Sequence, residues 1–187
     1  KKFLNAGPGY GGSCFPKDTL ALMKTAQDHD VPLRIVEATV QANDLRKRSM
    51  GRKIIQAMGG EARGKRVAVL GLTFKPNTDD MRDSPALAIV QTLLDAGAQV
   101  AAYDPEGMDI AAPMMPDVLM TDSAYAAAQG ADVVAIVTEW DAFRALDFAR
   151  LGESMKAKNL VDLRNIYRRE EAERHGFTYY AIGTSAA

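Results

Sequence analysis

The stretch RVAVLGLTFKPNTDDMRDSPALAIVQTLLDAGAQVAAY, residues 66–103, decides the fold of this chain. A short apolar run at 66–71 is followed by a polar loop, by Ser84-Pro85 and by a second apolar run at 98–103. Serine before proline is typical of a helix start, and a glycine such as Gly97 is typical of a helix end. Because short buried strands that alternate with helices form parallel sheets, this stretch predicts a strand-helix-strand unit.

The same alternation continues along the rest of the chain. The pattern predicts further strands at 117–120, 132–137, 159–163 and 177–181, and helices at 85–96, 122–129, 141–153 and 168–175. We therefore expect an α/β protein in which residues 59–187 form a doubly wound, Rossmann-like parallel sheet.

The residues before this sheet follow another pattern. A glycine-rich loop at 3–13 leads into a helix from about Lys17 to His29, which Val31-Pro32 interrupts. The segment 32–58 contains no further proline and predicts a second helix of about 40 Å. Such a helix is too long for one small domain, so we assign residues 1–58 to a loop and central helices that form a homodimer. The apolar positions expected to contact the second copy are Ile35, Val36, Thr39, Ala42, Leu45, Ile54 and Ile55.

Composition narrows the class of protein. Apolar residues make up 47% of the 187 residues, and 23 basic against 24 acidic side chains leave a net charge of -1 without any block of like charge. This balance does not favour nucleic acid or a membrane surface as a partner, and no apolar run approaches the ~20 residues of a membrane span. One cysteine and two histidines give no basis for a disulfide framework or a metal site. We expect a cytoplasmic protein, and a chain that reaches its glycine loop so soon after Lys1 is expected to be part of a longer one.

Cys14 is the candidate nucleophile. The glycines before it allow the backbone to approach a ligand closely, and a helix N-terminus together with Lys17 favours a thiolate. Asp18 lies one helical turn further on, where it could orient a water molecule or handle a proton. The alternative is a buried structural cysteine beside a tight turn, and residue chemistry alone leaves both interpretations open.

The run FLNAGPGYGGSCFPKDTL, Phe3–Leu20, resembles the cysteine loop of the UDP-glucose 6-dehydrogenase family. The resemblance extends over nearly the whole chain. It includes FKPNTDDMRDSP (Phe74–Pro85), YDP (Tyr103–Pro105), TEW (Thr138–Trp140) and VDLRNIY (Val161–Tyr167).

The resemblance implies a four-electron oxidation of a UDP-sugar C6 alcohol to a carboxylate, with two NAD+ used in turn, for polysaccharide synthesis. It implies that Cys14 carries thiohemiacetal and thioester intermediates and that Asp18 assists water or proton transfer. The residues that would contact the UDP-sugar are Phe3, Leu4, Asn5, Ala6, Gly7, Gly11, Lys75 and Arg164, and those that would contact NAD are Lys17 and Arg82. The family's amino-terminal NAD-binding domain would lie before Lys1.

Other interpretations remain for several of these residues. Gly71-Leu72-Thr73 lacks the further glycines of a dinucleotide fingerprint, and Lys75, Arg82 or Arg164 could be ordinary loop charges or surface ion pairs. The remaining polar and aromatic candidates are interpreted structurally: Asp79 and Asp80 as loop charges, Asp104 as a turn residue, Trp140 as packing, and His29 and His175 as exposed helix ends. GDP-mannose or another nucleotide sugar is the alternative substrate, and a non-catalytic nucleotide-binding and dimerisation module is the alternative from another class.

Overall fold

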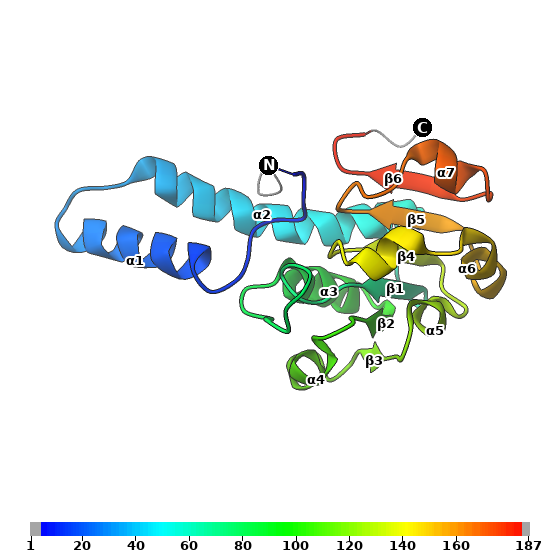
Figure 1. Cartoon of the computed structure of the whole chain (residues 1–187). Helices are drawn as coiled ribbons and strands as arrows, with labels where there is room; N and C mark the ends of the chain where they lie inside the picture. The colour runs from blue at the N-terminus through cyan, green and yellow to red at the C-terminus, as the bar shows by residue number, and fades with distance from the viewer. Residues whose placement is uncertain (1–4, 185–187) are drawn as a thin grey trace.

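The computed structural model describes residues 5–184. Two helices precede a region in which strands and helices alternate (Figure 1). The helices are α1 (Phe15–Asp28), α2 (Arg34–Ala57), α3 (Pro85–Asp95), α4 (Met108–Ala111), α5 (Ala124–Ala128), α6 (Phe148–Ser154) and α7 (Arg169–Glu173), with 3-10 turns η2 (Ala112–Met114) and η3 (Asp141–Ala145). The strands are β1 (Arg66–Leu70), β2 (Gln99–Tyr103), β3 (Leu119–Met120), β4 (Val133–Ile136), β5 (Asn159–Asp162) and β6 (Thr178–Ala181).

The six strands form one parallel sheet in the order β3-β2-β1-β4-β5-β6. This is the order of a Rossmann fold, in which the connections change direction between the first and fourth strands. The expected fold class is confirmed. Ligands of such sheets bind beyond the carboxyl ends of the strands, beside that change of direction.

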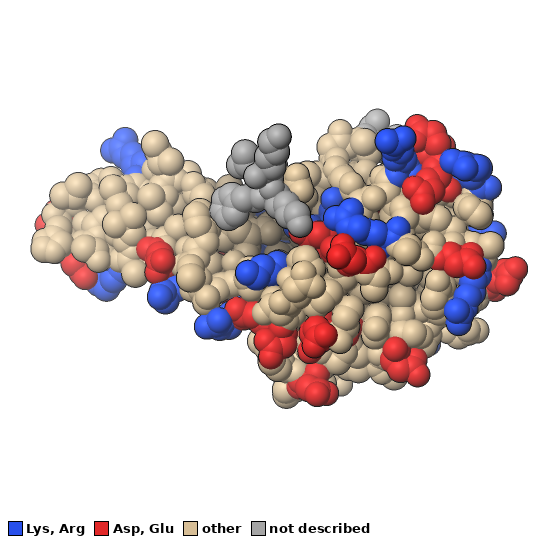
Figure 2. Space-filling view, in the orientation of Figure 1, with Lys and Arg blue, Asp and Glu red and all other residues tan. Residues whose placement is uncertain are grey.

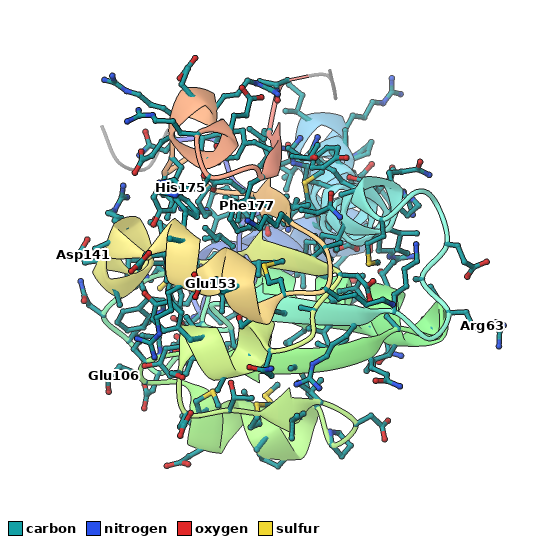
Figure 3. All side chains as sticks on the ribbon, turned by 90° about the vertical axis from the view of Figure 1, so that its right-hand side faces the viewer. Arg63, Glu106, Asp141, Glu153, His175 and Phe177 are labelled. Atoms are coloured by element: carbon teal, nitrogen blue, oxygen red, sulfur yellow. The ribbon has the colours of Figure 1, made fainter. Side chains whose placement is uncertain are left out.

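Both faces of the sheet are covered, which explains why its strands are almost continuously apolar. On one face Val67 and Val69 join a core with residues of α2 and α3. On the other, Ala68 and Leu70 join a core built from α5, α6 and α7. In Figure 3 the two ends of the sheet can be told apart: Glu106 and Asp141, which follow β2 and β4, lie at one end, and Arg63, which precedes β1, lies at the other.

Helix α2 belongs to two parts of the molecule. Its carboxyl half lies against α3, so closely that a Cβ at Gly51 would stand 2.6 Å from the Cβ of Thr92. Its amino half pairs with α1 in a hairpin that projects from the sheet (Figure 1). Ile35 and Leu45 on this hairpin are 84% and 63% exposed.

The expectation that every apolar position of the long helix needs an outside partner was wrong for two residues. Ile54 is fully buried and Ile55 is partly buried, because both pack into the core that the sheet shares with α3. The remaining apolar positions lie on the projecting half, where Thr39 and Ala42 are exposed and Val36 is half-buried.

The elements themselves differ from expectation in three places, and the other bounds shift by at most two residues. The helix expected at 141–153 is two short pieces, because Asp147 starts a new helix by accepting a hydrogen bond from the Arg150 amide at 3.1 Å. The strand expected at 117–120 is reduced to a two-residue edge strand, β3. Helix α4 and the turn η2 were not expected. No helix among the described residues is long and apolar enough to span a membrane.

Candidate active site

Four loops gather at the carboxyl edge of the sheet. They follow β1, β2, β4 and β5, at residues 72–83, 104–107, 138–140 and 163–167. The first, residues 72–83, is called the arginine loop below. Residues 5–14, called the cysteine loop, approach the same edge from the direction of α1 and α2.

Asp104 anchors three of these loops. Its carboxylate is 1% exposed, and Oδ2 accepts hydrogen bonds from the amides of Leu72 (2.7 Å) and Thr73 (3.1 Å) and from Trp140 Nε1 (3.1 Å). Its Oδ1 accepts from the amides of Glu106 and Gly107 at 3.0 and 2.8 Å. The residue expected to form a turn, Asp104, therefore also connects the ends of β1, β2 and β4. Trp140 is a packing residue, as expected, and its Nε1 donates to the buried Asp104.

Cys14 is exposed at the N-cap of α1, so the alternative of a buried structural cysteine does not hold. The Cys14 carbonyl accepts a hydrogen bond from the Asp18 amide at 2.8 Å, which places Asp18 one turn along the helix. Sγ lies 3.6 Å from Ser13 Oγ. The carboxylate of Asp18 forms an exposed ion pair with Lys17 at 3.5 Å.

The cysteine loop rests on the arginine loop. The Gly12 amide donates to the Arg82 carbonyl at 2.8 Å, and a Cβ at Gly11 would lie 2.3 Å from the Asp83 carbonyl oxygen. Gly12 also touches the ring of Phe74, over which the ammonium of Lys75 lies at 5.1 Å from the centroid. These close approaches require glycine at 11 and 12, and they bring Lys75 toward the base of the cysteine loop.

Arg82 lies on the exposed side of the arginine loop. Its guanidinium binds both oxygens of Asp80, at 2.9 and 2.8 Å, and these hydrogen bonds are the main cause that holds the pKa of Asp80 below its ordinary value. The pKa of Arg82 is raised mainly by Asp80 and, to a smaller extent, by the charge of nearby Cys14. A hollow of about 330 Å³ lies beside Arg82 and extends to α4, without including Cys14. It is lined by Asp79, Asp80, Met81, Arg82, Ile110 and Met114. Figure 2 shows one face of the molecule, where acidic and basic side chains lie side by side on the right and the visible charges along the lower edge are mainly acidic.

Arg164, after β5, reaches the cysteine loop from the other side. Its guanidinium forms an ion pair with Glu139 at 2.5 Å, and the side chains are only 15% and 23% exposed. Arg164 Nη1 would lie 2.4 Å from a Cβ at Gly7. The side chain is thus in an ion pair, as one interpretation held, but the pair is largely covered and touches the loop.

The structure does not bring all of the predicted site residues together. Asn5 and Ala6 are exposed, and Lys17 is paired with Asp18 rather than directed at Arg82. Phe3 and Leu4 lie outside the described residues. The sequence did not identify Glu139 as a site residue. It also did not identify a polar face of α2, formed by Asn43, Arg46 and Lys47. Their spacing of three and four residues places them on one side of a helix, but solvent-facing residues show the same spacing.

Comparison with known proteins places this geometry in a family. Residues 68–169 match the model of the UDP-glucose/GDP-mannose dehydrogenase family, UDP binding domain, and residues 1–45 match that family's central domain. The UDP-glucose 6-dehydrogenase of Rhizobium meliloti is 65% identical over 97% of this chain, and the chain spans 42% of that relative's length.

Solved structures agree with these matches. A UDP-glucose dehydrogenase from Pyrobaculum islandicum superposes with a TM-score of 0.83 at 32% identity, over 97% of this chain and 39% of its own. A UDP-D-ManNAc dehydrogenase from Pyrococcus horikoshii gives 0.77 at 29%, over 95% of this chain and 39% of its own. The family model alone covers more than half of the 187 residues, and the chain belongs to the UDP-glucose/GDP-mannose dehydrogenase family.

Proposed function

We propose that this chain supplies the catalytic cysteine and the nucleotide-sugar site of an NAD-dependent UDP-glucose 6-dehydrogenase, which forms UDP-glucuronate in the cytoplasm for polysaccharide synthesis. One observation carries the proposal: an exposed cysteine stands at the end of a glycine loop that is fastened to the ligand-binding edge of a family UDP-binding domain. The 65% identity to the Rhizobium enzyme supports UDP-glucose over GDP-mannose as the substrate.

The chemistry follows from the properties of a thiolate. Loss of a hydride and a proton from the C6 alcohol first gives the aldehyde. Cys14 Sγ adds to the aldehyde carbon and forms a C–S bond, and loss of a second hydride from that carbon leaves a thioester; NAD+ would accept each hydride. Water then adds to the thioester carbonyl, the C–S bond breaks, and the carboxylate leaves with Sγ restored. Overall, one alcohol and one water yield one carboxylate, two hydrides and three protons. Asp18, one turn from Cys14, would accept a proton from the attacking water.

The UDP-sugar would lie between the two loops. Lys75, over the ring of Phe74 near Gly12, and Arg164, near Gly7, would supply positive charge for the diphosphate, and the backbone of residues 5–7 and of Gly11 would contact the sugar. In the division we propose, residues 1–58 provide the cysteine loop and dimerisation helices, and residues 59–187 bind the UDP-sugar.

The hydride acceptor, NAD+, does not fit the turn after β1. A pyrophosphate bound there would need the amides of Leu72 and Thr73, and both are already used by Asp104. The space beside Gly71 is filled by Thr138, whose Cβ would lie 2.5 Å from an added Cβ. We therefore place NAD+ on a domain outside this chain, with Lys17 and Arg82 as exposed cations able to reach it. Alone, the chain should have no dehydrogenase activity.

A second copy of the chain is the proposed partner of the α1–α2 hairpin. Leu20, Leu22, Val31, Ile35 and Leu45 leave apolar surface exposed on this hairpin. Much of its visible surface in Figure 2 is uncharged. Closed two-fold pairs are the commonest oligomers, and a homodimer would cover these side chains.

Two measurements test the function. Thermal-shift titration of the chain should show stabilisation by UDP-glucose, less by GDP-mannose and least by NAD+; about 2.7 kcal/mol is expected at 100 times the dissociation constant. In the full-length protein, Cys14→Ala should abolish UDP-glucuronate formation while substrate affinity is kept, since the neighbouring contacts are mainly backbone. Stronger stabilisation by GDP-mannose would overturn the substrate, and turnover of Cys14→Ala within tenfold of the parent would overturn covalent catalysis.

A further inference from the structure

One turn of α2 presents three polar side chains to the site loops instead of to solvent. Asn43, Arg46 and Lys47 share one face of the helix, and Asn43 and Lys47 are only 8% and 7% exposed. These three residues are called the positioning face. Burying polar groups is unfavourable unless each finds a hydrogen-bond partner, so their partners indicate what the face does.

Asn43 holds the middle of the cysteine loop. Its Oδ1 accepts a hydrogen bond from the Tyr10 amide at 2.8 Å, and its Nδ2 donates to the Tyr10 carbonyl at 3.1 Å. The side chain therefore replaces the backbone partner that this residue would have in a strand. Because both groups of one residue are bound, the loop is fixed in position and in orientation, four residues before Cys14.

Arg46 holds the start of the described loop. Its Nε and Nη2 both donate to the Gly7 carbonyl, at 3.2 and 3.0 Å. Gly7 is also the residue against which Arg164 packs. The peptide is thus held between an arginine of α2 and an arginine that follows β5.

Lys47 connects the helix with the arginine loop. Its Nζ donates to the Asp83 carbonyl at 3.0 Å, and its aliphatic stem would meet a Cβ at Gly9 at 3.0 Å. Desolvation lowers the pKa of Lys47, partly opposed by the charges of Asp83 and Asp44. The hydrogen bond to the Asp83 carbonyl offsets part of the cost of burying the ammonium, a cost that an apolar side chain packed on Gly9 would not have.

We propose that Asn43, Arg46 and Lys47 are positioning residues that set the separation between the cysteine loop and the arginine loop, and thereby place Cys14 against the substrate carbon. The proposal rests on the function proposed above. The glycine-rich loop has high conformational entropy when unrestrained, and the four side-chain bonds to Gly7 and Tyr10 oppose it. The bond from Lys47 keeps the facing loop at the same distance.

The sharpest test is Lys47→Met in the full-length protein, because methionine keeps the aliphatic stem and removes only the donor. Misplacement of a reacting group by about 1 Å can cost about 100-fold in rate, so kcat should fall about 10- to 100-fold. The KM for UDP-glucose should change by less than about threefold, because the diphosphate contacts are elsewhere. Lys47→Arg should recover part of kcat, and Lys53→Met, the same change on the same helix, should leave kcat unchanged.

A second readout separates this proposal from the proposed function. In Lys47→Met and Asn43→Ala, the amides of residues 9–12 should exchange hydrogen faster than in the parent protein, while the strands of the sheet keep their protection. If the parent protein does not oxidise UDP-glucose, the proposed function fails and exchange still decides the role of the face. Unchanged loop exchange in both variants, or equal loss of kcat in Lys47→Met and Lys53→Met, would overturn the positioning role.

Discussion

Arg164 occupies the space in which residue 7 would carry a side chain: its Nη1 lies 2.4 Å from the position of a Cβ on Gly7. The guanidinium is held there by Glu139, and the Gly7 carbonyl is held on its other side by Arg46. The loops that follow β4 and β5 and helix α2 therefore each bring a residue to one peptide of the cysteine loop. A side chain at position 7 would therefore displace the guanidinium of Arg164, although the backbone angles of Gly7 are open to other residues.

Gly7→Ala should weaken the binding of UDP-glucose by about tenfold, or ~1.4 kcal/mol, because the added methyl group displaces Arg164 from its place beside Glu139. Isothermal titration on the chain measures this. In a double-mutant cycle, Gly7→Ala should add little to Arg164→Gln, since both act on the same guanidinium. Fully additive losses would show that the methyl group acts elsewhere.

Asp104→Asn should lower the free energy of unfolding by about 2–4 kcal/mol. Either oxygen that becomes an amide NH2 would face N–H donors, from Leu72, Thr73 and Trp140 on one side or Glu106 and Gly107 on the other. Urea unfolding followed by the fluorescence of Trp140, the single tryptophan, gives the value directly. Asp109→Asn, an exposed aspartate on α4, serves as the control and should change the unfolding free energy by less than about 0.5 kcal/mol.

Two buried tyrosines predict a loss of stability at high pH. Burial raises the pKa of Tyr167 to about 12, and burial together with the charge of Asp162 raises that of Tyr179. A folded-state pKa above the unfolded value of about 10 means that the folded protein holds its phenolic protons longer. This contribution is complete below pH 10 and is lost as the pH rises through 12.

Tyr179→Phe tests that sign. The variant should be less stable than the parent near neutral pH, because it lacks the hydroxyl that donates to Asp162 at 3.0 Å and to the Tyr167 carbonyl at 2.9 Å. The difference in unfolding free energy should become smaller as the pH rises above about 10. A difference that stays constant over this range in urea titrations would contradict the assignment.

Leu45→Asp should dissociate the proposed homodimer, since Leu45 is 63% exposed on the hairpin and a buried aspartate without a partner is costly. Light scattering at micromolar concentration would report a monomer. Leu119→Asp is a matched control at an exposed leucine on the edge strand β3, 54% exposed, and should leave the dimer intact. A parent chain that is already monomeric at this concentration would refute the dimer itself.

Local signals in the sequence predicted the fold well. Ser84 starts α3 by accepting a hydrogen bond from the Ala86 amide at 3.2 Å, and Gly97 adopts a φ of 82° after the helix, as Ser-Pro and glycine indicate. Features that depend on contacts with residues far along the chain could not be predicted from local signals. The break between η3 and α6 combines a local cap at Asp147 with a bond from the Leu146 amide to the hydroxyl of Tyr167, 21 residues away.

In the candidate site, too, some residues are identified by local sequence and others only by distant contacts. Cys14, Arg82 and Arg164 were identified because each lies in a distinctive run of residues. Their roles in one active site remain a prediction for experiment. The positioning face was missed because Asn-Asp-Leu-Arg-Lys on a helix is typical of a solvated surface. Only the return of a loop 33 residues away, at Tyr10, buries Asn43.

The continuity of α2 limits how this part of the molecule can move. The helix runs unbroken for 24 residues, about 36 Å, and its only internal glycine, Gly51, is wedged against Thr92 of α3. Its carboxyl half is locked into the sheet core and its amino half is tied to Tyr10 and Gly7. We therefore expect the cysteine loop and the sheet to keep a fixed position relative to each other. In the full-length enzyme proposed above, opening of the active site would then require the proposed cofactor-binding domain to move relative to this chain.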